Sequence, residues 1–319
     1  MTLPVNILPV SRVHLLTDNP PEKRWLVSDL WSYGAVGIIG GEPKCGKSIL
    51  TLSIAVAVAS GMPCLGRFPV ATKGRVLLFA AEDPLGVVKA RVAAVALSYG
   101  VNLSELEIFV ITQPTLRLDI DAEYKLLRDT VEKIAPRLLI LDPFIRLHRV
   151  DENISGEVAP LLSKLRHIQR SFNVSVIVVH HARKDSKHGR QGQALRGSSE
   201  FHAWGDSNLY LRRNQNDSIS LSIEHRAERS LPPLDLLLSA NELGPFHQIL
   251  AAAPDTEITK PTIESKIINL LKSSSAPMNF TTIRSITKLR SQAVSTALNS
   301  LLELGTVDRS KNGYGIRIS

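Results

Sequence analysis

One short segment has the residue types and spacing of a phosphate-binding loop. Residues 40–48 read GGEPKCGKS, which contains the pattern G-x-x-x-x-G-K-[ST]. An apolar run at 35–39 precedes the segment and predicts a buried strand, and an apolar stretch at 49–59 follows it at helical length. Between a strand and a helix, such a loop turns several backbone N–H groups toward one phosphate. The segment therefore predicts nucleotide binding, and the alternative is a glycine-rich turn.

The side chains of this loop have separate tasks in that chemistry. Lys47 is expected to reach the β- and γ-phosphates, and the Ser48 hydroxyl is expected to ligate Mg²⁺. The expected cofactors are therefore ATP and Mg²⁺. The residues expected to line the nucleotide are Gly41, Glu42, Pro43, Lys44, Cys45, Gly46, Lys47, Ser48 and Ile49.

Two acidic side chains follow later predicted strands and could complete a hydrolytic site. Residues 74–81 form one apolar run, and another ends in Asp142. Because ligands bind at the carboxyl ends of the strands in open α/β sheets, we expect Asp142 to hold Mg²⁺. Glu82 is expected to orient and deprotonate the attacking water. The alternative for Glu82 is an acid that favours a helix start, where Asp83 and Pro84 predict an N-cap and first turn.

Two histidines follow a further predicted strand at 174–179. His180 and His181 could sense the γ-phosphate, and a structural role or metal binding are the alternatives. Metal is disfavoured because neighbouring residues of a strand face opposite sides. The next segment, 182–199, is glycine-rich and basic, which predicts a mobile loop that contacts nucleic acid, or a plain surface loop. Its candidate DNA-binding residues are Arg183, Lys184, Lys187, Arg190 and Arg196.

Strand-like runs at 207–212, 218–224 and 234–238 predict antiparallel strands that extend the sheet. Arg226 and Arg229 lie between the last two runs. Either guanidinium could reach the γ-phosphate of a neighbouring subunit as an arginine finger, and surface ion pairing is the alternative. The sequence does not choose between the two arginines.

The C-terminal fifth of the chain predicts a winged helix-turn-helix, with Ser291 capping the third helix and a turn at Asn312 and Gly313. The three helices and the hairpin are expected at 262–271, 281–288, 291–304 and 307–318. From Lys260 onward, nine Lys and Arg residues stand against three Asp and Glu residues, a net charge of +6. This charge favours DNA binding, with protein docking as the alternative. The candidate DNA contacts are Lys288, Arg290, Arg309 and Lys311.

The patterns together predict an α/β fold with a mostly parallel sheet and a small second domain. The expected parts are an extended arm at 1–24, an ATPase domain at 25–250, a linker at 251–261 and the winged helix at 262–319. The net charge of +8 suggests a polyanionic partner. Two cysteines are too few for a disulfide framework. The sequence contains neither a membrane-spanning run nor a signal peptide, so we expect a cytoplasmic protein that does not bind membranes.

The order of the motifs resembles that of a known group of ATPases. Beyond the phosphate loop, the pieces that carry the resemblance are 80–84, 139–142, 146–148, 152–156, 180–182 and 196–199. Over about 25–245, the chain resembles the RepA-type hexameric replicative helicases of broad-host-range plasmids, within the RecA-like P-loop ATPases. The resemblance implies a RecA-like core, a homo-oligomeric ring with a hexamer favoured, ATP between subunits and single-stranded DNA in the channel. It also implies that Glu82 is the catalytic base and that His180 or His181 couples nucleotide state to the channel loop.

Two main hypotheses follow. The first is a Mg²⁺-dependent ATPase of a plasmid or other mobile element that translocates on single-stranded DNA and unwinds duplex. The second is a DNA-binding regulator, loader or recombination accessory that uses ATP as a switch without unwinding. A signalling ATPase similar to KaiC would differ from both because DNA would not stimulate its hydrolysis.

Overall fold

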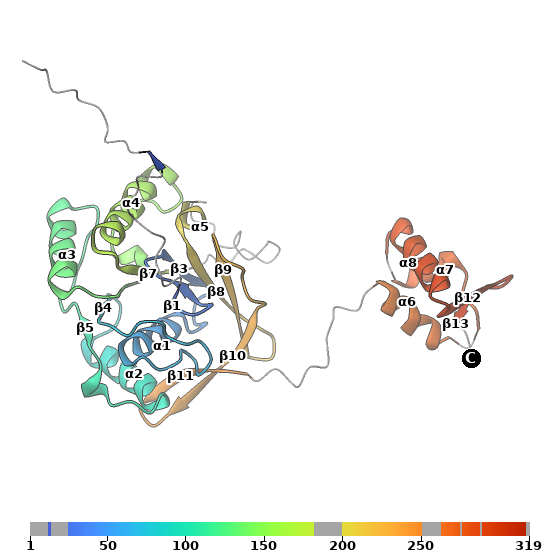
Figure 1. Cartoon of the computed structure of the whole chain (residues 1–319), viewed down its shortest axis with the longest axis horizontal. Helices are drawn as coiled ribbons and strands as arrows, with labels where there is room; N and C mark the ends of the chain where they lie inside the picture. Colours follow the sequence, from blue (N-terminus) through green and yellow to red (C-terminus); the bar gives the residue numbers. More distant parts are fainter. Residues whose placement is uncertain are drawn as a thin grey trace, which may run out of the picture. The chain divides into compact units, whose positions relative to one another are not determined.

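The computed structural model describes residues 12–13, 25–181, 200–250, 263–274, 276–287 and 289–316. The chain forms two compact units that divide between Leu250 and Ala251 (Figure 1). Apart from residues 12 and 13, the predicted arm and the predicted linker lie outside the described residues, and so does the basic loop at 182–199. Among the described helices, none is long and apolar enough to cross a membrane.

The first unit is built on one nine-stranded sheet with the order β11-β10-β9-β8-β3-β7-β6-β4-β5. The strands from β8 to β5 pair in parallel, whereas β8, β9, β10 and β11 pair antiparallel to one another. The bounds are β3 Val36–Gly41, β4 Val76–Ala80, β5 Ile108–Val110, β6 Leu138–Asp142, β7 Ser175–His181, β8 Ser207–Arg213, β9 Ile219–His225, β10 Leu234–Asn241 and β11 Gly244–Ile249. The predicted mostly parallel α/β sheet is confirmed. The first of the strands predicted as antiparallel, β8, is in fact parallel to β3.

Helices cover both faces of the sheet because its central strands are apolar on both sides. Along β4, Val76 and Leu78 belong to one core cluster, and Leu77 and Phe79 belong to the other. The first cluster contains buried residues of α1 and α2, and the second contains those of α3 and α4. The helices are α1 Lys47–Ser60, α2 Leu85–Ser98, α3 Asp121–Ile134, α4 Ser155–Phe172 and α5 Glu200–Trp204. Short elements complete the unit: β1 Trp25–Val27, β2 Trp31–Ser32, η2 Leu103–Glu105 and η3 Phe144–Arg146.

The last strand of this unit, β11, was not predicted from the sequence. It pairs with β10 along its whole length and packs against α1 and α2. Asn241, at the end of β10, donates a hydrogen bond from Nδ2 to the carbonyl oxygen of Ala94 in α2 at 2.8 Å. The β10–β11 hairpin therefore lies over the helices that follow the phosphate loop and the next strand.

Two predicted helix caps were wrong. Helix α2 has Pro84 in extended geometry as its N-cap, without a side-chain cap, while the Asp83 carboxylate pairs with Arg91. The ion pair with the Arg91 guanidinium occupies the carboxylate that an Asp83 cap would require. Helix α8 (Ser291–Glu303) has Arg290 as its N-cap, so Ser291 is the first helical residue rather than the cap.

The second unit contains three helices followed by a two-stranded hairpin. The helices and strands are α6 Ile263–Lys272, α7 Phe280–Thr287, α8, β12 Val307–Ser310 and β13 Gly313–Ile316. They share one small core that includes Ile267, Ile283 and Leu298. Because Ser310 pairs with Gly313, the two turn residues are 311 and 312. The unit thus has its own apolar core, in the element order predicted for it.

Candidate nucleotide site

The predicted phosphate loop joins β3 to α1, and its backbone explains two of its glycines. Gly41 has a φ of 151°, and a Cβ placed on it would lie 2.2 Å from the carbonyl oxygen of Leu211. Gly46, the N-cap of α1, has a φ of 80°, and a Cβ there would lie 2.5 Å from Nε2 of His247. Only glycine fits both the left-handed backbone and the close approach of β8 and β11. The loop is therefore held against the strands on one side of β3.

Lys47 is 5% exposed, and its ammonium group is held by the loop itself. Nζ donates hydrogen bonds to the carbonyl oxygens of Gly41 at 3.0 Å and Glu42 at 2.7 Å. Burial lowers the pKa of Lys47, and the nearby Cys45, Asp142 and Glu82 oppose that shift. The buried Cys45 thiol donates to the same Glu42 carbonyl at 2.8 Å, and burial raises its pKa. A phosphate bound in this loop would replace carbonyl oxygens as the partner of the Lys47 ammonium.

Asp142 lies at the carboxyl end of β6, opposite Ala80 of β4. Burial raises the pKa of Asp142 to about 6, and the neighbouring Glu82 acts in the same direction. A side-chain hydrogen bond with Ser48 opposes this shift. The structure thus brings together the two residues predicted to hold Mg²⁺. A hydroxyl and a carboxylate are hard oxygen donors that fit a magnesium ion carrying water and phosphate ligands.

Metal binding by protein side chains alone is not indicated elsewhere. Among the described residues, no group of three or more His, Cys, Asp or Glu side chains could hold a metal ion. His181 lies at the end of β7, opposite Gly41 in the register of the sheet.

Glu82 lies just beyond the end of β4, and its side chain is 44% exposed. Its Oε1 is 3.3 Å from Nε of Arg146, which ends η3. Because β4 and β6 are neighbours in the sheet, Glu82 and Asp142 belong to the same edge. The side chain predicted to activate water is therefore accessible to solvent and faces a cation from the loop after β6.

A partly buried acid, Glu152, lies beside two histidines next to this edge, and the sequence did not predict this group as a unit. Nε2 of His180 is hydrogen-bonded to Oε2 of Glu152 at 3.2 Å, and Nε2 of His148 lies 3.2 Å from Oε1. Burial raises the pKa of Glu152, but the contacts with His148 and His180 outweigh it and lower that pKa to about 2. Phe201 packs on the His180 ring at 4.4 Å and on Phe144 at 5.1 Å. His180 is therefore tied to the loop that also carries Arg146.

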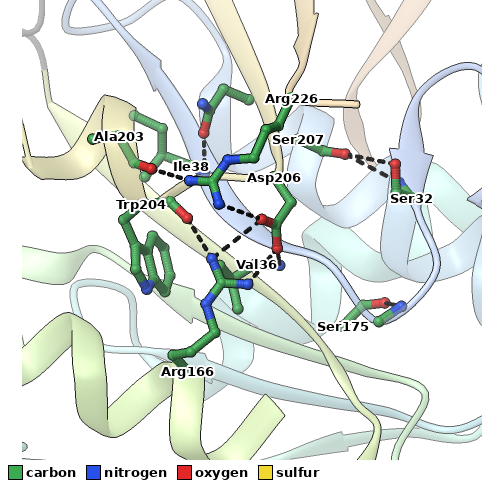
Figure 2. A network of polar contacts seen from close by, with 12 residues as sticks. Ser32, Val36, Ile38, Arg166, Ser175, Ala203, Trp204, Asp206, Ser207 and Arg226 are labelled. Carbon is green, nitrogen blue, oxygen red and sulfur yellow. Dashed lines mark hydrogen bonds and ion pairs between the residues drawn. The ribbon is translucent and has the colours of Figure 1, made fainter. Parts of the chain in front are cut away.

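Arg226 belongs to a second network, centred on Asp206 (Figure 2). Its guanidinium lies 3.4 Å from Oδ1 of Asp206 and also donates to the carbonyl oxygen of Ala203. Asp206 in addition accepts from Arg166 of α4 and from the backbone N–H of Val36 at 3.2 Å. The structure thus places Arg226 in the surface ion pairing that was its alternative interpretation.

Arg229, by contrast, is exposed on the segment between β9 and β10. Nothing in the described residues ties its guanidinium to Asp206, because the ion pairs of Asp206 are with Arg166 and Arg226. The two finger candidates therefore differ in their surroundings.

His247 lies near the phosphate loop, and no motif in the sequence singles it out. Its side chain is 4% exposed in β11 and lies against Gly46. Burial lowers the pKa of His247 to about 4. An isolated histidine in a short strand carries no motif, so only the three-dimensional structure reveals this contact.

The predicted DNA contacts are described only in part. Arg290, Arg309 and Lys311 are exposed in the second unit, and the Arg309 guanidinium lies 5.6 Å from the ring centre of Tyr314. The other candidates lie outside the described residues: Arg183, Lys184, Lys187, Arg190, Arg196 and Lys288.

Comparison with known proteins gives two findings. A family model described as an AAA domain, AAA_25, matches residues 4–187. A crystal structure of the RadB recombinase is similar with a TM-score of 0.48 and 19% sequence identity, over 67% of this chain and 90% of that chain. The family match spans more than half of the chain and includes the phosphate loop, Glu82, Asp142 and His180. The chain therefore belongs to the AAA_25 family of AAA domains, a family of RecA-like P-loop ATPases.

Proposed function

We propose that the protein is a Mg²⁺-dependent ATPase that acts on DNA. One observation carries the proposal: Lys47, Ser48, Asp142 and Glu82 gather at the carboxyl ends of β3, β4 and β6. This edge offers an ammonium and helix N–H groups for phosphate, two oxygen donors for a metal ion, and a solvent-accessible carboxylate for water. These are the parts that phosphoryl transfer to water requires.

Each side chain has a separate role in the proposed reaction. Lys47 neutralises the β- and γ-phosphates, and Ser48 and Asp142 hold Mg²⁺, which lowers the charge on the phosphates when bound. Glu82 orients the water and accepts its proton. His180 lies at the end of β7, where the chain enters the basic segment, so it is placed to link the nucleotide edge to that segment.

DNA association rests on charge and on the second unit. The C-terminal region carries most of the net positive charge of the chain, and its three helices and hairpin are consistent with a winged helix-turn-helix. We propose that Arg290, Arg309 and Lys311 contact DNA phosphates there, and that the cations of 182–199 contact single-stranded DNA. We also propose a homo-oligomeric ring, with a hexamer favoured, in which Arg229 rather than Arg226 completes a neighbour's site, because Asp206 already holds Arg226.

The test of this function is ATP hydrolysis by the full chain with and without single-stranded DNA. We expect Mg²⁺-dependent turnover that DNA stimulates and that Lys47→Ala abolishes. A wild-type rate for Lys47→Ala would show that the site is assigned wrongly. Arg75→Ala is a matched control, because Arg75 pairs with Glu107 on the surface and belongs to no proposed site.

A second candidate function is an ATP-switched DNA-binding regulator or loader, favoured by the separate basic C-terminal unit. Strand displacement with ATP distinguishes the two. Directional unwinding supports a helicase. The regulator is supported if the full chain binds DNA tightly and sequence-specifically without unwinding it. This binding should be lost when Arg290, Arg309 and Lys311 are all changed to Ala.

A further inference from the structure

Among the described residues, His247 differs from the buried His148 and His180 in having no carboxylate beside its ring. Its side chain is 4% exposed, and neither ring nitrogen has a hydrogen-bond partner in the part of the chain that the structure describes. His148 and His180, in contrast, both lie against Glu152. Burying an imidazole without a partner lowers stability, and a leucine or phenylalanine would fill the same space without that loss. The nitrogens of His247 therefore need an explanation other than packing.

The ring of His247 is directed at the phosphate loop. A Cβ placed on Gly46 would lie 2.5 Å from Nε2 and 2.8 Å from Cε1 of His247. Gly46 is the N-cap of α1, so the ring lies at the helix end that faces the phosphates. Arg213 of β8 reaches the same loop and donates from Nη2 to the carbonyl oxygen of Lys44 at 3.1 Å. Strands β8 and β11 thus both contact the loop through nitrogen-bearing side chains.

The order of the strands indicates which end of a nucleotide would meet His247. Glu82 and Asp142 follow β4 and β6, which lie on one side of β3, whereas β8 to β11 lie on the other side. The γ-phosphate belongs near the two acids, because they serve water and the metal ion. In a nucleotide held in this direction, the sugar and base extend from the loop toward β11. The sugar–base half is therefore the part nearest His247.

From these observations we propose that His247 binds the nucleotide through a hydrogen bond between its imidazole and the ribose or base. The proposal rests on the proposed ATPase function and adds a recognition residue to that site. Phosphate binding would replace the contacts of Lys47 with the carbonyls of Gly41 and Glu42. The proposal requires that the loop then shift away from the buried ring that lies against Gly46.

The experiment compares two ligands that differ only in the nucleoside: ATP and inorganic tripolyphosphate, each with Mg²⁺. Dissociation constants and the thermal midpoint of unfolding are measured for the wild-type full chain and for His247→Phe. We expect His247→Phe to weaken ATP binding about threefold to tenfold, which corresponds to the loss of one hydrogen bond. The dissociation constant of tripolyphosphate is expected to stay unchanged. Without ligand, its thermal midpoint is expected to rise, because the unpartnered nitrogens are gone.

His202→Phe is the matched control. His202 is hydrogen-bonded through Nδ1 to the Tyr210 hydroxyl at 3.0 Å and precedes β8, at the end of the strand away from the phosphate loop. This variant is expected to lower the thermal midpoint and to leave both dissociation constants unchanged. Lys47→Ala is the positive control, because it is expected to weaken the binding of both ATP and tripolyphosphate.

Two results would overturn the proposal. If His247→Phe weakens the binding of ATP and tripolyphosphate equally, the ring only supports the loop. If the variant weakens the binding of neither ligand, the ring has no part in nucleotide binding. If His247→Phe does not fold, His247→Gln and His247→Leu replace it, and ATP affinity must then be higher for the glutamine variant. Failure of the ATPase function itself is distinguishable, because the wild-type chain would then show no Mg²⁺-dependent ATP hydrolysis, whatever its affinities for the two ligands.

Discussion

Replacing Glu152 with glutamine should destabilise the first unit and should do so in a pH-dependent way. The contacts with His148 and His180 lower the pKa of Glu152 from 4.5 to about 2, despite the opposing effect of burial. A difference of this size corresponds to about 3 kcal/mol of stability. The side chain is only 19% exposed, so solvent screens little of this energy. We therefore expect Glu152→Gln to lose about 3 kcal/mol at pH 7.

The sign of the pH dependence follows from the direction of the shift. A carboxyl whose pKa is lower in the folded protein contributes its full stability above pH 4.5, and loses that contribution as the pH falls toward 2. The difference between wild type and Glu152→Gln should therefore be constant from pH 7 to pH 6. It should shrink by roughly 1 kcal/mol between pH 6 and pH 4.

Urea unfolding monitored by tryptophan fluorescence measures this difference in the intact chain. The three tryptophans, Trp25, Trp31 and Trp204, all lie in the first unit, so the signal reports on that unit alone. Glu107→Gln is the control, because its pair with Arg75 is about half exposed and is worth less than about 1 kcal/mol. A loss below about 0.5 kcal/mol for Glu152→Gln, or a difference that grows as the pH falls, would mean that the contacts with His148 and His180 do not stabilise the Glu152 carboxylate.

Three further predictions concern the same unit. Gly46→Ala should weaken the binding of inorganic tripolyphosphate at least tenfold in a calorimetric titration, because a Cβ there meets His247 at 2.5 Å. Adding His247→Ala should restore part of that affinity, and no restoration would argue against the contact. Asp206→Ala should lower the free energy of unfolding, measured in urea, by about 3 kcal/mol, because it leaves the largely buried Arg166 without its carboxylate. The control Asp217→Ala removes the exposed pair with Arg213 and should change the free energy of unfolding by less than about 1 kcal/mol. Arg146→Ala should change kcat for ATP without changing KM, because the ion pair of Arg146 among the described residues is with Glu82 rather than with the phosphate loop. Equal effects on kcat and KM would instead place Arg146 in nucleotide binding.

The sequence predicts which residues meet at the candidate nucleotide edge because the determinants of their positions are local. The phosphate loop lies between two apolar runs, and Glu82 and Asp142 directly follow apolar runs, so the carboxyl ends of parallel strands must bring them together. The strand β11 is different, because Gly244 and Pro245 open a segment with weak strand propensity. It becomes a strand by pairing with β10, which is a tertiary effect.

The polar networks were harder to predict because their members are distant in sequence. Glu152 is four residues from His148 but 28 from His180, and Arg166, Asp206 and Arg226 come from three separate elements. No spacing rule links such residues before the sheet order is known. The predicted cap at Asp83 was wrong for a related reason, since its carboxylate pairs with Arg91 eight residues later. For Ser291, the structure shows that this residue begins the helix and that Arg290 is the N-cap.

The position of β11 also matters for the chain that follows it. This strand is the last element of the first unit, and only a few residues separate His247 from Leu250, after which the chain continues toward the second unit. A mechanical load on the second unit, such as drag along a DNA strand, would thus pull first on the strand that lies beneath Gly46. In the proposed ATPase, the covalent path of the polypeptide would therefore transmit tension from the second unit directly to the strand that contacts the phosphate loop.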